Sequence, residues 1–164
     1  PSCPQNALMR LLKDKKVSVR LQAASNSSCP QSVIGHLAED EDEETRCTVA
    51  GNSACPPSIL ERLAEDADEL TWKAAVGNPS CPPNILERFA NRKDWRVREL
   101  VAGNPSCSPD VIAHLASDEN AYIRSVVAEN PSAPRETIMR LAKDEDGSVR
   151  CVAICNPIFL ADTK

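Results

Sequence analysis

Apolar residues recur along this chain in two short clusters that repeat every 26 residues. Positions in the first cluster have helical spacing, as in Ile59, Leu60 and Leu63, which fall on one face of a helix. A second cluster of Val, Ile, Thr and Ala follows after a polar turn. One position of the first cluster is Leu or Phe in all six repeats: Leu11, Leu37, Leu63, Phe89, Leu115 and Leu141. The pattern predicts two short helices in every repeat.

Turn-forming residues mark the ends of these helices at the same interval. Proline stands at the start of the first helix, where its missing N–H costs no hydrogen bond. The second helix ends in sequences such as Gly103-Asn104-Pro105, in which Gly or Asn can take the left-handed cap position. One position is always Asn: Asn26, Asn52, Asn78, Asn104, Asn130 and Asn156. We expect these Asn side chains to bond backbone groups of the turns.

The expected helices have only about seven to ten residues, a length at which an isolated helix is marginal in water. One repeat therefore cannot be stable alone, and neighbouring repeats must stack to bury their apolar faces. This predicts an all-α, right-handed α-solenoid without a sheet, in a single domain over residues 1–164. The expected repeats are 1–26, 27–52, 53–78, 79–104, 105–130 and 131–156, with 157–164 as a C-terminal cap.

The repeat pattern D-x-x-x-x-V-R-x-x-V-A-x-N-P-x-x-P-x-x-[VI]-[LI]-x-x-L-A resembles the leucine-rich repeat variant family over essentially the whole chain. HEAT-like repeats are the neighbouring interpretation, but their units are longer, at about 40–47 residues. The resemblance implies paired helices, one α-helical and one short and often 3₁₀, and no enzymatic activity. We expect the Pro-initiated helix to be regular and the Val-Arg helix to be the 3₁₀ or variable one. Some family members carry an iron–sulfur segment ahead of the repeats, and Pro1 begins in mid-register, so an upstream portion is expected.

The composition is that of an ordinary globular chain, with 41% hydrophobic and 26% charged residues. Lys and Arg number 19 against 24 Asp and Glu, so the net charge of −5 disfavours a general attraction to nucleic acid or anionic membranes. No run approaches the roughly 20 apolar residues of a membrane span, and no secretory leader opens the chain. The sequence shows neither a Ser/His/Asp constellation nor a glycine-rich phosphate loop, and we expect no enzyme and no cofactor.

Cysteine occupies one repeat position five times, and Ala takes the sixth: Cys3, Cys29, Cys55, Cys81, Cys107 and Ala133. Because Ala keeps the small apolar volume and lacks sulfur chemistry, the position is predicted to hold a small buried residue rather than a metal or redox site. A reactive thiol remains the alternative, since a helix N-terminus lowers a thiol pKa. Cys151 and Cys155 are one helical turn apart, near enough for a labile metal site but without further ligands. Free thiols favour a reducing, cytoplasmic location.

Charged residues also follow the repeat. A basic position, Arg10, His36, Arg62, Arg88, His114 and Arg140, precedes by four residues the position Asp14, Asp40, Asp66, Arg92, Asp118 and Asp144. Residues four apart are neighbours on a helix, so we expect ion pairs between them. Six residues further on lie Arg20, Arg46, Trp72, Arg98, Arg124 and Arg150, and each Asp is expected to be shared between its two basic neighbours, closing the turn.

This charge pattern breaks in one place, where Trp72 replaces Arg and Arg92 replaces Asp. Interface hot spots favour Trp and Arg, and Arg can stack on Trp. The predicted partner-binding residues are Trp72, Arg88, Arg92, Lys93, Trp95 and Arg96. The alternative is local repacking, in which Trp72 covers the Arg side chains and Asp94 and Glu99 neutralise them. The acidic run 39–44 is either a solvated turn or a site for a basic partner or weak Ca²⁺ binding.

These observations predict a monomeric, non-enzymatic scaffold for protein–protein interaction, with an unknown protein partner and no membrane. A redox or iron–sulfur-linked accessory protein, with its cluster segment outside this chain, is the first alternative. Nucleic-acid binding is the second, disfavoured by the net charge.

Overall fold

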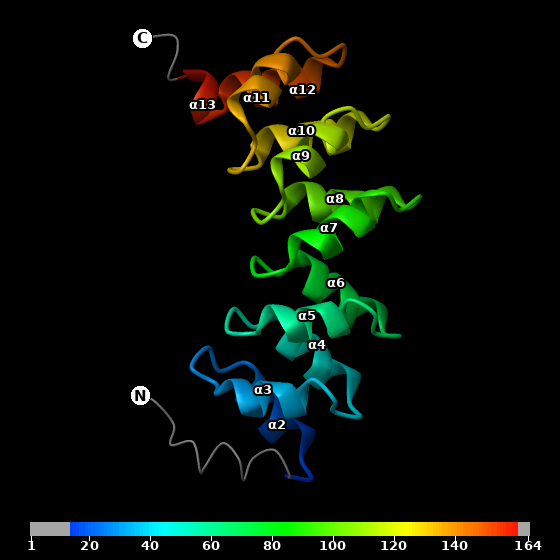
Figure 1. The fold of residues 1–164 in the computed structure, drawn as a ribbon, viewed down its shortest axis with the longest axis vertical. Helices are drawn as coiled ribbons and strands as arrows, with labels where there is room; N and C mark the ends of the chain where they lie inside the picture. Colours follow the sequence, from blue (N-terminus) through cyan, green and yellow to red (C-terminus); the bar gives the residue numbers. More distant parts are fainter. Residues whose placement is uncertain (1–13, 161–164) are drawn as a thin grey trace. The chain divides into compact units, whose positions relative to one another are not determined.

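The computed structural model describes residues 14–160, and the chain divides into two compact units, Pro1–Pro82 and Pro83–Lys164. Every element of the described residues is an α-helix, and they contain no strand (Figure 1). The sequence positions Cys3, Arg10 and Leu11 lie outside the described residues. The fold class predicted from the sequence, an all-α helical repeat, is confirmed; a single domain of six repeats stays a prediction.

The first unit alternates two kinds of helix. Its described helices are α2 (Val17–Ala24), α3 (Gln31–Leu37), α4 (Glu43–Gly51), α5 (Pro57–Leu63) and α6 (Glu69–Gly77). Helices α2, α4 and α6 are the second helices of successive repeats, and α4 contacts both of the others. The Pro-initiated helices α3 and α5 pack against these neighbours. Successive repeats of this unit are thus stacked through their second helices.

The second unit repeats this arrangement. Its helices are α7 (Pro83–Ala90), α8 (Trp95–Gly103), α9 (Pro109–Leu115), α10 (Ala121–Glu129), α11 (Arg135–Leu141), α12 (Gly147–Cys155) and α13 (Pro157–Leu160). Helix α10 contacts α8 on one side and α12 on the other. The short α13, which covers the described part of the expected C-terminal cap, contacts α11 and α12 but leaves Leu160 48% exposed.

The second helices after α2 each begin at a side-chain cap, whereas α2 follows Lys16 and has none. Asp42, Asp68, Asp94, Asn120 and Asp146 each accept a hydrogen bond from a backbone N–H of the first turn. Such a cap satisfies a donor that a helix start otherwise leaves unpaired. Helices α4, α6, α8, α10 and α12 are each nine-residue α-helices. The second helices of the described residues are thus α-helical, and the 3₁₀ form that the resemblance makes frequent does not occur among the described helices.

The helix ends also differ from expectation. No described residue has a positive φ, so neither Gly103 nor Asn104 forms a left-handed cap. Asn104 is extended instead, at φ −76° and ψ 124°, and its N–H bonds the carbonyl of Val101. Extended backbone at this position lets the chain leave the helix without the left-handed turn for which Gly is usually required.

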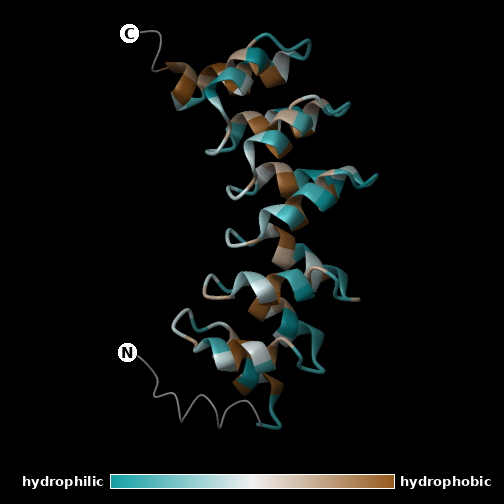
Figure 2. Ribbon diagram, in the orientation of Figure 1, coloured by the Kyte–Doolittle hydropathy of each residue, from teal (hydrophilic) through white to brown (hydrophobic). Residues whose placement is uncertain are grey.

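The apolar clusters form the core of each unit. Leu37, Leu63, Leu115 and Leu141 are at most 1% exposed, and Phe89 is 4% exposed. The second helices contribute the other apolar positions, and Thr45 and Thr71 are fully buried there in place of Val. Figure 2 shows hydrophobic colour on the helices and hydrophilic colour in the Asp-containing turns. Burial of these short faces against neighbouring repeats stabilises helices that could not persist alone.

Candidate functional site

Arginine–aspartate pairs join successive repeats within each unit. Arg98 donates from Nε to Asp118 Oδ2 at 2.6 Å and from Nη2 to Oδ1 at 3.0 Å. The same two-bond pair occurs for Arg20 with Asp40, Arg46 with Asp66, and Arg124 with Asp144. In each pair the Asp comes 20 residues after the Arg. Two parallel bonds of this kind are the strongest arrangement available to a guanidinium and a carboxylate.

These paired Arg residues are also anchored inside their own turn. The Nη1 group of Arg124 donates to the carbonyl of Asp118, six residues earlier, and the Arg98 Nη1 group donates to the carbonyls of Arg92 and Lys93. Only about a tenth of each side chain of the Arg98–Asp118 pair is exposed. Burial is the largest single influence on the pKa of Asp118 and raises it. The hydrogen bonds from Arg98 and from the backbone N–H of Asn120, together with the positive charges nearby, outweigh burial and hold that pKa below its usual value.

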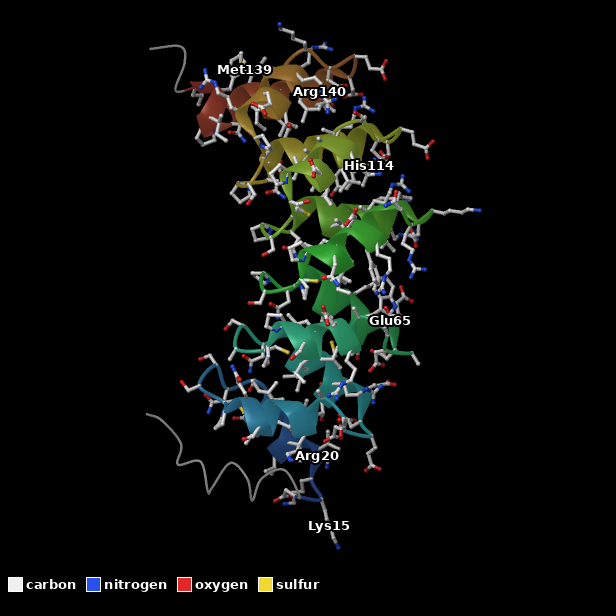
Figure 3. The ribbon with its side chains drawn as sticks, in the orientation of Figure 1. Lys15, Arg20, Glu65, His114, Met139 and Arg140 are labelled. Atoms are coloured by element: carbon white, nitrogen blue, oxygen red, sulfur yellow. The ribbon has the colours of Figure 1, made fainter. Side chains whose placement is uncertain are left out.

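The expected pairing with the Asp four residues later is wrong as to partner for Arg62 and Arg140. His114 fits it better, because its charge helps to lower the pKa of Asp118. The exposed Arg62 bonds Glu39 of the preceding repeat at 2.7 Å, not Asp66. Arg140, labelled with His114 in Figure 3, donates to the hydroxyl of Ser117 at 3.1 Å. The Asp at each turn is already held by the Arg of the preceding repeat, so the base on the first helix reaches backwards as well. The charged side chains thus link neighbouring repeats, and the Arg of each pair also closes its own turn through backbone carbonyls.

Asparagine forms a second set of links between repeats. Asn130 Nδ2 donates to the carbonyls of Ala102 and Asn104, at 2.6 and 3.0 Å, in the preceding repeat. Its Oδ1 accepts from the backbone N–H of Ser132, which closes the turn of its own repeat. Asn52, Asn78 and Asn156 likewise donate to the alanine carbonyl 28 residues earlier. The predicted role of the Asn position in bonding turn backbone is correct, and the link to the neighbouring repeat is additional.

The six predicted partner-binding residues fall in two units. Trp72 lies half-buried on α6 in the first unit, where the Lys73 ammonium is 5.7 Å from its ring centroid. Arg88, Arg92, Lys93, Trp95 and Arg96 lie on α7, on α8 and in the turn between them, in the second unit. These five therefore lie in one helix–turn–helix segment. Trp72 belongs to the first unit, and its participation in one binding site with the other five residues stays a prediction.

In the second unit, arginine guanidinium groups lie over aromatic rings. Arg88 and Arg92 are 5.3 and 5.1 Å from the ring centroid of Phe89, whose side chain is buried. Arg96 lies 5.4 Å from the ring centroid of Trp95, which is 40% exposed. Cations within about 6 Å of an aromatic face are attracted to it and are held in place at little cost. The sequence-based expectation that Arg would stack on Trp is met here, by Arg96 on Trp95.

Tyr122 contacts Trp95, and the sequence pattern did not indicate this contact. Its ring meets that of Trp95 edge-on, with centroids 6.0 Å apart and planes at 84°. Its hydroxyl donates to Glu99 at 2.9 Å, and this hydrogen bond raises the pKa of the tyrosine. Tyr122 is the only Tyr of the chain and lies in the first turn of α10, the second helix of the next repeat, 27 residues after Trp95. The spacing of 27 residues is one repeat of 26 plus one residue, so it places Tyr122 near the equivalent position of the next repeat, and this is the signal that could have predicted the contact.

The cations of this surface lack carboxylate partners in the described residues. Asp94 accepts from the backbone N–H of Arg96 as the cap of α8, and Glu99 accepts from Tyr122. Within the described residues, neither carboxylate forms an ion pair with Arg92, Lys93 or Arg96. The neighbouring Arg98, in contrast, donates two hydrogen bonds to Asp118. We call Arg92, Lys93, Trp95, Arg96 and Tyr122 the Trp95 surface. It combines three exposed positive charges with two exposed aromatic rings.

The repeated cysteine position is a packing position. Cys29, Cys55, Cys81 and Cys107 are buried, and so is Ala133. Burial raises the pKa of Cys55 to about 12 and that of Cys81 to about 11. A thiol with such a pKa carries almost no thiolate at neutral pH, and thiolate is the reactive form. Both findings favour the small buried residue over the reactive thiol.

The acidic run 39–44 is partly committed to the fold. Asp40 is bonded by Arg20, and Asp42 caps α4 by accepting from Thr45. No group of three or more His, Cys, Asp or Glu side chains in residues 14–160 is placed to hold a metal ion. The described helices also include none that is long and apolar enough to cross a membrane.

Residues 95–120 match the family model described as leucine rich repeat variant. They form a leucine-rich repeat variant repeat. This segment contains α8, α9 and both members of the Arg98–Asp118 pair. The resemblance of the chain to the leucine-rich repeat variant family is confirmed.

A solved structure supports the same conclusion at the level of the fold. The protein described as "a leucine-rich repeat variant with a novel repetitive protein structural motif" is similar over 94% of this chain and 72% of its own, at 27% identity and a TM-score of 0.51. No curated protein matches the sequence. These similarities support the repeat fold, and the role of the Trp95 surface rests on its own chemistry.

Proposed function

We propose that this leucine-rich repeat variant chain is a non-enzymatic protein-binding module and that the Trp95 surface contacts its partner. The observation that supports this most directly is the set of exposed cations without carboxylate partners beside exposed aromatic rings. Elsewhere, Arg20, Arg46, Arg98 and Arg124 are all neutralised by Asp. Three neighbouring cations that lack a carboxylate within the chain favour binding of a protein that supplies complementary negative charge.

The chemistry of this surface fits an acidic segment of another protein that also carries an apolar side chain. Arg92, Lys93 and Arg96 would bond its carboxylates, and the edge-to-face pair of Trp95 and Tyr122 would pack against the apolar group. Trp, Tyr and Arg are the residue types that dominate interface energetics. A uniform polyanion fits less well, because the chain carries a net charge of −5 and its positive charge is local.

Fluorescence anisotropy of the full chain with a labelled Glu-rich peptide containing one Phe tests this proposal. The double variant Arg92→Ala/Arg96→Ala should bind the peptide about tenfold or more weakly, since two charge contacts of about 1 kcal/mol each are lost. Binding should also weaken as salt is raised, because exposed charges are screened.

Arg62→Ala is the matched control, because Arg62 is exposed like Arg92 but is paired with Glu39. It removes one positive charge outside the Trp95 surface and should leave peptide affinity unchanged. Equal affinity of the wild type and the double variant would refute the proposal. Tighter binding of a single-stranded oligonucleotide than of the peptide would favour nucleic-acid binding instead.

A further inference from the structure

Two exposed cysteines lie together on the last long helix of the second unit. Cys151 and Cys155 are one helical turn apart on α12, and both are exposed free thiols. Both line the same surface hollow of about 340 Å³. Its other lining residues are Ala128, Glu129, Val152, Asn156 and Pro157. The two sulfurs therefore share one small, solvent-accessible space.

The other described cysteines are differently placed. Cys29, Cys55, Cys81 and Cys107 are buried in the core position of the repeat. Cys47, at the repeat position equivalent to Cys151, is half-buried, and burial raises its pKa, with help from nearby Asp68 and Glu44. The chain has Gly51 at the position equivalent to Cys155, so Cys47 has no second thiol one turn away. The pair on α12 is the one place in residues 14–160 where two exposed thiols share a helix face.

The spacing of this pair suits a shared ion. Side chains four residues apart on a helix have Cβ atoms about 5–6 Å apart, and thiolate–metal bonds are about 2.3 Å long, so two sulfurs can meet on one ion. No third His, Cys, Asp or Glu ligand joins them in the described residues. Structural Zn²⁺ needs four ligands, whereas soft thiolates select Cu⁺, which accepts two.

We propose that Cys151 and Cys155 form a dithiolate site for a soft, two-coordinate thiophilic cation, Cu⁺. On binding, each thiol gives its proton to solvent and each sulfur donates one electron pair to the ion, with no change of oxidation state. The ion lies in the hollow beside Val152 and Pro157, whose apolar groups suit the low charge of a two-thiolate complex. The two sites share no residue, although Tyr122 of the Trp95 surface and two residues that line the hollow, Ala128 and Glu129, all lie on α10.

Titration of the reduced full chain with Cu⁺, without oxygen and against a colorimetric Cu⁺ chelator, tests the site. The wild type should bind one Cu⁺ tightly, and Cys151→Ser or Cys155→Ser should each bind about 100-fold or more weakly, since the second ligand acts at high effective concentration. Sulfur-only coordination by two ligands in X-ray absorption is the expected spectroscopic signature.

Cys47→Ser is the matched control and should leave Cu⁺ affinity unchanged, because Cys47 lacks a partner thiol. Ser closely matches Cys in size at both exposed positions, and circular dichroism establishes that the variants remain folded. Equal Cu⁺ affinity in the wild type and the Cys151→Ser/Cys155→Ser variant would overturn the proposal. So would tight binding of Zn²⁺ at the pair with four protein ligands.

Discussion

Two turns of the second unit occupy the same place in successive repeats but are used differently. In the turn before α10, Asp118 takes two bonds from Arg98, and its carbonyl holds Arg124. In the turn before α8, Arg92 stands at the Asp position, and only its carbonyl keeps the structural role, by accepting from Arg98. At both positions the backbone carbonyl accepts a hydrogen bond from the Arg six residues later, but the side chain of Arg92 is exposed and has no Arg partner within residues 14–160. A repeat can thus change its surface chemistry without losing its turn.

Breaking the paired turn is expected to have the largest effect. Asp118→Ala leaves the Arg98 guanidinium buried beside two carbonyls, with only the exposed Glu119 carboxylate, 3.8 Å away, in place of the two-bond partner. Removing one partner of a buried pair costs about 3 kcal/mol or more. Urea unfolding followed by circular dichroism measures this loss of stability. A change below about 0.5 kcal/mol, typical of a surface position, would mean that the two turns do not differ as proposed.

The asparagine link should be the next most important. Asn130→Ala removes the bonds to the carbonyls of Ala102 and Asn104 and the bond from the Ser132 N–H. Leaving buried backbone groups unpaired costs about 1–3 kcal/mol, which the same unfolding experiment would detect. Asn91→Ala is the control, because the Asn91 side chain is exposed and makes a single bond to the carbonyl of Glu87. A similar cost for both substitutions would argue against the inter-repeat role of Asn130.

Acid should weaken the paired turns in a defined direction. Hydrogen bonds from Arg46 and Arg124 hold the pKa values of Asp66 and Asp144 below the usual range. A carboxylate with a lowered pKa in the folded state stabilises the protein fully above its unfolded pKa of about 3.9, and this stabilisation is lost as pH falls through the folded value. Unfolding free energy should therefore decline below about pH 4. Asp144→Asn should reduce that decline, and an unchanged pH profile would contradict it.

The unpaired turn should be the least sensitive of all. Arg92→Ala removes a side chain that has no ion pair in the described residues and only a stacking contact with Phe89. We expect a change in unfolding free energy within about 0.5 kcal/mol, while binding of the acidic peptide falls. If Arg92→Ala instead destabilised the chain as strongly as Asp118→Ala, local repacking would be the better interpretation of this turn.

The sequence was sufficient for the helical repeat because each apolar position recurs six times and helical spacing is explicit. Leu63 and Leu115 are buried as the pattern required. It was insufficient for the partners of the charged residues. Spacing of four residues suggested that Arg62 would meet Asp66, but the stacking distance between repeats brings Glu39 closer. Contacts between repeats depend on how helices stack, which a pattern within one repeat does not contain.

The candidate surface was only partly predictable, because one of its contacts joins two repeats. Arg92 stood out because it departs from the repeated Asp, and Trp95 and Arg96 because they lie beside it in the sequence. Tyr122 lies in the next repeat, and its importance comes from its contact with Trp95 across two helices. The left-handed cap expected at the C-terminal ends of the second helices was wrong. Local turn preferences favour such a cap, but hydrogen bonds to the surrounding backbone stabilise Asn104 in an extended conformation.

The links between repeats have a consequence for how such a chain can lengthen. The donors and acceptors of the Arg–Asp and Asn links stand 20, 26 or 28 residues apart, always in neighbouring repeats. Duplication of a 26-residue stretch therefore supplies every new donor with an acceptor at the correct offset, whereas insertion of 25 or 27 residues would mismatch each link that spans the insertion. Gene duplication in units of 78 nucleotides is thus the mutational step that this bonding scheme tolerates.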